Sequence, residues 1–249
     1  MGVHPTAAHG FHGDVYERGR PGYPADVIGP LGITSDTAVC DVGCGTGKFT
    51  RLAADTGARV VGVEPLTDMV GVFTRALPDV PVVVGIAEAL PLRERSFDVV
   101  VCASVFHWLN HDLALPEFHR VLRPGGRLGI VWNRRDKLTG WSADFWRITE
   151  AHRGDTPGYR SSAWSDALEA SDLFGPIEEQ WFDHVQRTDV EGLIARVASI
   201  SFIETLPPAA RDAVLQESRD FLATHPDTRD QTVFELPYRT AVYTVSRVD

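Results

Sequence analysis

Residues 39–50, with the sequence VCDVGCGTGKFT, decide the fold of this chain. The apolar residues 38–42 predict a buried strand, and glycines at positions 43, 45 and 47 predict a turn that leads into a helix near Lys48. Glycine permits positive φ and lets a ligand approach main-chain N–H groups, and the helix N-terminus adds partial positive charge. The stretch therefore predicts a ligand-binding strand, turn and helix.

The spacing separates three ligand classes for this turn. A phosphate-binding P-loop fails, because Val42 stands where its first glycine belongs and Phe49 where it needs Ser or Thr. The interpretation as a dinucleotide-binding turn is weakened, because Lys48 stands where the third glycine of that motif belongs and Asp41 places a carboxylate in the turn. A carboxylate suits a ligand that presents a cation, such as the amino group of an amino-acid tail.

The next apolar segment supports this interpretation. Residues 59–63 predict a second strand that ends in Glu64, about twenty residues after the first glycine. An acidic side chain at that neighbouring strand end can accept hydrogen bonds from both hydroxyls of a ribose. We therefore expect Glu64 to bind a ribose, although the end of a strand is also a common place for a solvated acid.

The pattern D-x-G-x-G-x-G over residues 41–47 resembles motif I of the class I S-adenosylmethionine (SAM)-dependent methyltransferases. The segments SFDVV at 96–100 and HRVLRPGGRL at 119–128 extend the resemblance. It implies an α/β, Rossmann-like sheet of seven strands in the order 3-2-1-4-5-7-6, with strand seven antiparallel and an α-helical cap. We expect an N-terminal lid and first helix over residues 1–36, a SAM-binding core over 37–135, and a cap with the closing strands over 136–249.

The resemblance, in particular to small-molecule enzymes of the trans-aconitate methyltransferase type, also implies a cofactor site. Residues 16–24 contain two prolines and two glycines that oppose a regular helix, and residues 10–24 are expected to form a mobile lid. One departure is Ile86, which stands where the family commonly has aspartate, so the backbone of Ala87 and the side chain of Glu88 are left as adenine contacts. The implied cofactor-binding residues are Tyr16, Arg20, Asp41, Gly43, Gly45, Thr46, Gly47, Glu64, Pro65, Met69, Ala87, Glu88 and Ser104.

The methyl acceptor is expected beyond the ends of the fourth and fifth strands, where open α/β sheets bind ligands. His107 is the candidate base there, because an unperturbed imidazole accepts a proton near neutral pH. The sequence leaves open whether a base is used, and whether oxygen, nitrogen or carbon is methylated. The expected substrate-binding residues are Trp108, Trp132, Asn133, Trp146 and Tyr159.

Composition narrows the class of protein. The 249 residues are 43% hydrophobic, enough for a full core. No apolar run is long enough to span a bilayer, and the N-terminus lacks the pattern of a signal peptide, so a cytoplasmic protein without membrane contact is expected. Three cysteines without paired spacing indicate buried thiols and no metal site.

The net charge of −10 disfavours a nucleic-acid partner, so a small-molecule acceptor is expected. We predict transfer of a methyl group from SAM with release of S-adenosylhomocysteine, by a monomer or a homodimer. A SAM-binding protein without transfer activity stays an alternative. A nicotinamide-dependent oxidoreductase is a weaker one, because Asp41 and Lys48 disfavour it.

Overall fold

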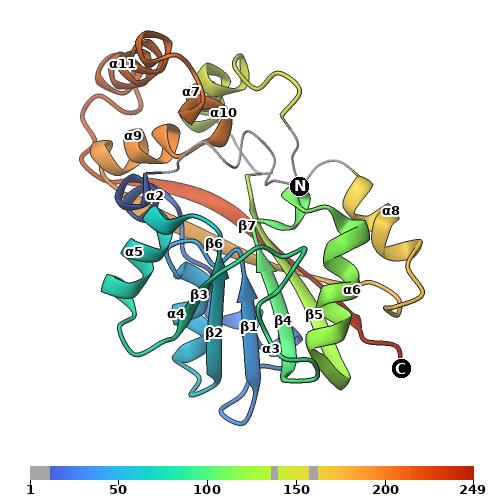
Figure 1. The fold of residues 1–249 in the computed structure, drawn as a ribbon. Helices are drawn as coiled ribbons and strands as arrows, with labels where there is room; N and C mark the ends of the chain where they lie inside the picture. The colour runs from blue at the N-terminus through green and yellow to red at the C-terminus, as the bar shows by residue number, and fades with distance from the viewer. Residues whose placement is uncertain (1–11, 136–139, 157–161) are drawn as a thin grey trace.

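The computed structural model describes residues 12–135, 140–156 and 162–249. Seven strands form one sheet in the order β3-β2-β1-β4-β5-β7-β6, which confirms the predicted order (Figure 1). The strands from β3 to β5 pair in parallel, and β7 pairs antiparallel with both β5 and β6. Their bounds are β1 (Ala38–Val42), β2 (Arg59–Glu64), β3 (Val82–Val84), β4 (Phe97–Ala103), β5 (Leu122–Arg134), β6 (Glu178–Thr188) and β7 (Phe234–Ser246).

The helix predicted near Lys48 is present and begins at that residue. Residues 190–204 form two successive helices, because the chain leaves helical geometry at Ile200. The helices are α2 (Gly13–Gly19), α3 (Ile28–Leu31), α4 (Lys48–Ala54), α5 (Thr67–Ala76), α6 (His111–Val121), α7 (Trp141–Glu150), α8 (Ala163–Glu169), α9 (Val190–Ala198), α10 (Ser201–Glu204) and α11 (Pro208–Thr224). Two 3-10 helices lie at Ala25–Val27 and Phe106–Trp108.

The central parallel strands of the sheet, β1 and β4, are buried on both faces. Every residue of β1 is buried, and its side chains divide between two apolar clusters. Val39 packs with residues of α3 and α4, whereas Cys40 and Val42 pack with residues of α6. Because helices cover both faces of the central strands, a ligand would bind at the carboxyl ends of these strands.

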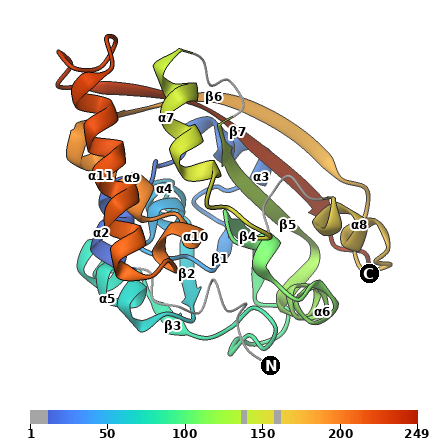
Figure 2. The ribbon, with the colours of Figure 1, turned by 90° about the horizontal axis from the view of Figure 1, so that it is seen from above.

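A third apolar cluster forms the cap. Helices α7, α9, α10 and α11 gather at one end of the sheet, and the view from above shows them grouped together (Figures 1 and 2). Their shared core also contains Phe234, Leu236 and Tyr238 from the start of β7. Because the same strand then continues into the sheet beside β5, β7 ties the cap to the sheet.

The N-terminal segment differs from expectation, because residues 13–19 form helix α2. The sequence DVYER within it has neither proline nor glycine, and Pro21 comes only after the helix has ended. The backbone N–H of Gly13 donates to Asp68 Oδ2 at 2.6 Å. Helix α2 is thereby attached to α5. Within the described ranges, no helix has the length and apolar content needed to cross a membrane.

Candidate active site

The glycine turn after β1 adopts a backbone that other residues rarely take. Gly43, Gly45 and Gly47 have φ of 66°, 57° and 89°. A Cβ on Gly43 would lie 2.6 Å from a methyl carbon of Val105, so the turn also lacks room for a side chain. The main chain itself therefore forms this part of the cavity wall at Gly43 and Gly45, whereas Gly47 precedes α4 behind it.

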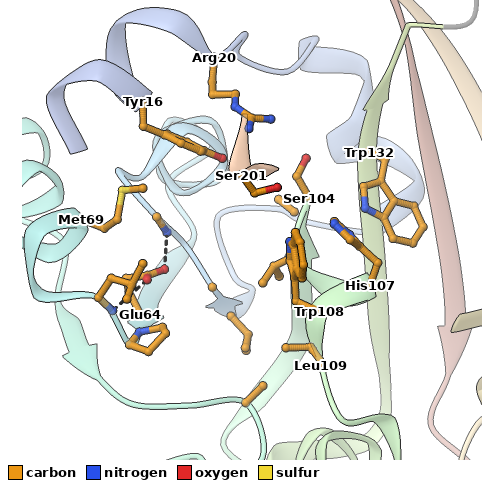
Figure 3. A pocket seen from close by; sticks show the side chains of 18 of the residues that line it. Tyr16, Arg20, Glu64, Met69, Ser104, His107, Trp108, Leu109, Trp132 and Ser201 are labelled. Carbon is orange, nitrogen blue, oxygen red and sulfur yellow. Dashed lines mark hydrogen bonds between the residues drawn. The ribbon is translucent and has the colours of Figure 1, made fainter. Parts of the chain in front are cut away.

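Glu64 is fixed at the end of β2. Its side chain accepts the N–H of Gly45 at 2.9 Å through Oε2 and that of Leu66 at 3.0 Å through Oε1 (Figure 3). Burial raises the pKa of this carboxyl, while both N–H groups act in the opposite direction. Each oxygen keeps a lone pair for a further donor, so the carboxylate is oriented to accept the two hydroxyls of a ribose.

Asp41 lies behind the turn and does not line the cavity. It is completely buried, and Thr50 Oγ1 donates to its Oδ2 at 2.5 Å. Its Oδ1 has no hydrogen-bond partner within the described chain. Burial raises the pKa of Asp41 to about 7, which the bond from Thr50 partly opposes. The structure therefore separates Asp41 from the ligand by the turn, and any effect on a ligand cation is indirect.

One cavity joins the glycine turn to the cap. It has about 1480 Å³ of empty space, including the part that opens to solvent. Figure 3 shows Glu64 and Met69 on one side, and His107 and Trp132 on the other. Of the predicted site residues, the cavity is lined by Tyr16, Arg20, Gly43, Gly45, Glu64, Pro65, Met69, Ala87, Glu88, Ser104, His107, Trp108, Trp132 and Asn133.

Glu17 attaches α2 to the glycine turn. Its carboxylate accepts Thr46 Oγ1 at 2.5 Å and lies 3.4 Å from Lys48 Nζ and 3.7 Å from Arg51. Thr46, which was predicted to bind the cofactor, instead uses its hydroxyl to bind α2. The residue lines only a smaller pocket that adjoins the main cavity. Helix α2 is thus held over the turn, which places Tyr16 and Arg20 at the cavity.

The predicted adenine side combines apolar and polar groups. Met69 on α5 is 3% exposed, and its side chain lies near Glu64 at the cavity (Figure 3). Glu88 Oε1 accepts the N–H of Asn110 at 2.9 Å, just before α6 begins. Glu88 therefore has a structural role as well as a place in the cavity wall.

The ends of β4 and β5 carry Ser104, which was predicted to bind the cofactor, and most of the residues predicted to bind the acceptor. Ser104 has φ of 64° and shares a 3.0 Å hydrogen bond with the hydroxyl of Tyr23. The His107 ring lies 6.2 Å from that of Trp132, measured between centroids. Asn133 Nδ2 donates to the carbonyl of Gly22 at 2.8 Å, so this side chain also holds the segment after α2.

The expected pKa of His107 is wrong. Burial, and to a smaller extent the charges of Arg20 and His111, together lower the pKa of His107 to about 3. The Nδ1 atom has no hydrogen-bond partner within the described chain. The imidazole is therefore neutral at physiological pH and has little tendency to accept a proton.

One predicted substrate-binding residue, Trp146, does not line the cavity. Trp146 on α7 is 2% exposed and belongs to the apolar core of the cap, so it supports the wall from behind. Its ring is covered by the guanidinium of Arg135, with 3.9 Å between the guanidinium carbon and the ring centroid. Tyr159 lies outside the described residues.

Sequence reasoning missed several residues of the cap side. Arg196 carried a signal, because it falls three residues after Leu193 on the apolar face of α9. An arginine on an apolar helix face is expected to be buried, and a buried charge indicates a specific binding role. The other missed lining residues include Leu109, Arg135, Arg153, Ile200, Ser201 and Phe202.

A family model and a sequence relative that match this chain are both described as methyltransferases. Residues 40–130 match the family model described as a methyltransferase domain. An uncharacterized methyltransferase of Mycobacterium tuberculosis (strain ATCC 25618 / H37Rv) is 37% identical over 225 residues, which cover 90% of this chain and 89% of the relative.

Solved structures resemble the whole fold. A protein of Anaeromyxobacter dehalogenans described as a type II methyltransferase matches with a TM-score of 0.63 at 23% identity, covering 92% of this chain and 96% of the other. The Haemonchus contortus phosphoethanolamine N-methyltransferase 2, solved with phosphomonomethylethanolamine and S-adenosylhomocysteine, has a TM-score of 0.53 at 18% identity, covering 90% of this chain and 52% of the other.

Proposed function

Since the chain belongs to the methyltransferase family and has its class I fold, we propose that it transfers a methyl group from SAM to a small-molecule acceptor. One observation carries the proposal. A single cavity connects the glycine turn and Glu64 with the strand ends at His107 and Trp132, beneath the cap. Such a cavity has room for a cofactor and an acceptor together. The cap over it favours a small acceptor above a macromolecule.

The cofactor half fits SAM by its own chemistry. Bound SAM supplies an electrophilic methyl group on a sulfonium. Glu64 would accept the ribose hydroxyls, Met69 and Ala87 would contact the adenine, and Tyr16 and Arg20 would bind the carboxylate of the amino-acid tail. Asp41 favours the cationic amino group from behind the turn. S-adenosylhomocysteine would bind through the same groups.

The other half of the cavity would align the acceptor. Ser104 and His107 offer a hydroxyl and a neutral imidazole at the strand ends, and Trp108 and Trp132 offer apolar surface. Alignment and exclusion of water suit methyl transfer, because proximity contributes up to roughly 7–11 kcal/mol in well-oriented reactions. We assign His107 to positioning, since a pKa of about 3 makes it a poor base at neutral pH.

The test is incubation with methyl-labelled SAM and small-molecule fractions of the host, followed by mass identification of labelled products. We expect one labelled product that depends on active protein and is lost in the Glu64→Ala variant. S-adenosylhomocysteine binding without any labelled product would instead support a binding protein without transfer activity. We further propose a cytoplasmic protein, monomeric or homodimeric, that needs no metal or nucleic acid.

A further inference from the structure

The cap side of the cavity is cationic although the chain is acidic overall. Four arginines line it, Arg20, Arg135, Arg153 and Arg196, whereas the chain has a net charge of −10. The two lining acids lie on the cofactor side, where Glu64 ends β2 and Glu88 follows β3. Apart from Arg20, which we assign to the cofactor carboxylate, these guanidinium groups therefore lie on the side that we assign to the acceptor.

Arg196 is a buried cation without a carboxylate. It is 6% exposed, and its Nε lies 3.4 Å from the hydroxyl of Tyr238. Its Nη1 has no hydrogen-bond partner, and no acidic side chain pairs with it in the part of the chain that the structure describes. A buried charge without a counter-ion is costly, so an anion from outside the chain would stabilise it.

Arg20 adds a second, partly buried guanidinium close by. It donates to the hydroxyl of Ser199 at 3.0 Å and to the Ser199 carbonyl, and lies over the Tyr16 ring. Burial and the neighbouring charge of Arg196 lower the pKa of Arg20 to about 10. The cofactor supplies only one carboxylate, which we assign to Tyr16 and Arg20, so Arg196 still needs an anion.

Arg135 and Arg153 extend the cationic wall. Arg153 binds Glu150 through two hydrogen bonds of 2.7 and 2.8 Å, and Arg135 lies 4.0 Å from the same carboxylate. Both Arg135 and Arg196 lie against the Trp146 ring, at 3.9 and 5.4 Å from its centroid. The two guanidinium groups therefore share one aromatic ring of the cap.

Apolar residues border these cations. Ile200 and Phe202 line the same cavity, and Trp108 lines it from the β4 side. The guanidinium carbon of Arg153 lies 5.1 Å from the Phe202 ring centroid. Resting on the proposed function, we propose that the acceptor is an amphipathic oxyanion whose carboxylate or phosphate group binds Arg196 and Arg135 while its apolar body contacts Ile200 and Phe202. The anionic group anchors the acceptor at the cap.

The anchored group differs from the atom that is methylated. Methyl transfer removes negative charge from an attacking oxyanion, so guanidinium groups bound to it would stabilise the ground state more than the transition state. A second, nucleophilic group must therefore reach the methyl beside Ser104 and His107. The acceptor carries two functional groups at opposite ends.

The experiment titrates three probes into protein saturated with S-adenosylhomocysteine, by calorimetry. The probes are 3-phenylpropionate, phenyl phosphate and the neutral 3-phenylpropionamide. We expect at least one oxyanion to bind ten times more tightly than the amide or better, and the preferred oxyanion separates carboxylate from phosphate recognition. Equal affinity for all three probes would overturn the inference.

Variants locate the anion. Arg196→Met should weaken the preferred oxyanion about 10- to 100-fold, the range for loss of a charged hydrogen bond, and leave the amide within twofold. Arg229→Met is the matched control, since it removes one exposed charge outside the cavity and should change neither affinity. Arg135→Met provides a second test, should Arg196→Met fail to fold by circular dichroism.

The two proposals fail separately. If wild-type protein does not bind S-adenosylhomocysteine, the proposed function fails before any probe is added. If Arg196→Met loses S-adenosylhomocysteine affinity and keeps the oxyanion preference, Arg196 belongs to the cofactor site and the inference is overturned. If both affinities are unchanged in Arg196→Met and Arg135→Met, the anion does not bind at this wall.

Discussion

The low pKa of His107 should affect the stability of the folded chain as well as catalysis. Its pKa is about 3 in the folded chain and near 6.5 in an unfolded chain, so the folded state resists protonation. The stabilisation that follows is fully present above pH 6.5 and is lost as the pH falls from 6.5 toward 3. Between pH 8 and pH 5, His107 should cost the wild type about 2 kcal/mol of unfolding free energy.

The assay compares urea unfolding of the wild type and His107→Gln at pH 8 and pH 5. The variant should lack this loss of about 2 kcal/mol, and measurement at pH 8 corrects for any other effect of the substitution. The reasoning is refuted if both proteins lose the same free energy over this interval, because the pKa of His107 would then be ordinary.

The same pKa predicts the pH dependence of catalysis. A base with a pKa of about 3 forgoes most of the 10²- to 10⁴-fold contribution of general base catalysis at neutral pH. With an identified acceptor, kcat should show no His107 inflection between pH 5 and 8, and His107→Ala should lower it by less than about 100-fold. An inflection near pH 6 that disappears in His107→Ala would restore the assignment of His107 as a base.

Three other predictions concern the cofactor half. Glu64→Ala should weaken S-adenosylhomocysteine by about 1.5–3 kcal/mol in calorimetry, and an unchanged affinity in folded protein would exclude a ribose contact. The affinity for S-adenosylhomocysteine should rise from pH 5 to pH 7 and level off above, because the cationic amino group of the ligand favours ionised Asp41, whose pKa is about 7. Asp41→Asn should abolish this rise, and a rise that persists in the variant would show that another group causes it. Hydrogen exchange in residues 12–24 should slow when S-adenosylhomocysteine binds and should quicken in Glu17→Gln, whereas equal protection in all three samples counts against a lid.

Much of the fold was predictable because its signals are local. The buried strand before the glycine turn and the acid that ends β2 are each set by a few adjacent residues, whereas the strand order was implied by the family resemblance; the structure confirms all three. The helix α2 was missed because the two glycines and two prolines of residues 16–24 were taken to oppose a helix, although all four come at or after its last residue.

The rest of the site depends on contacts between distant segments. Aromatic content placed Trp146 at the acceptor, but the apolar side chains of α9 and α11 draw it into the cap core. The pKa of His107 depends on burial and on Arg20, which is 87 residues earlier in the chain and reaches it only after folding. Neither the burial of Trp146 nor the low pKa of His107 can be predicted from the residues that adjoin them in the sequence.

Helix α2 links the two halves of the cavity physically. Glu17 attaches it to the glycine turn, whereas Arg20 at its end donates to Ser199 in the cap. A Cβ on Gly19 would lie 2.4 Å from backbone atoms of α9, so the two helices touch through their main chains. A ligand that fixes Tyr16 and Arg20 therefore also fixes α9, and with it Arg196 at the acceptor. Cofactor binding should consequently prepare the oxyanion site, because the same short helix contacts both.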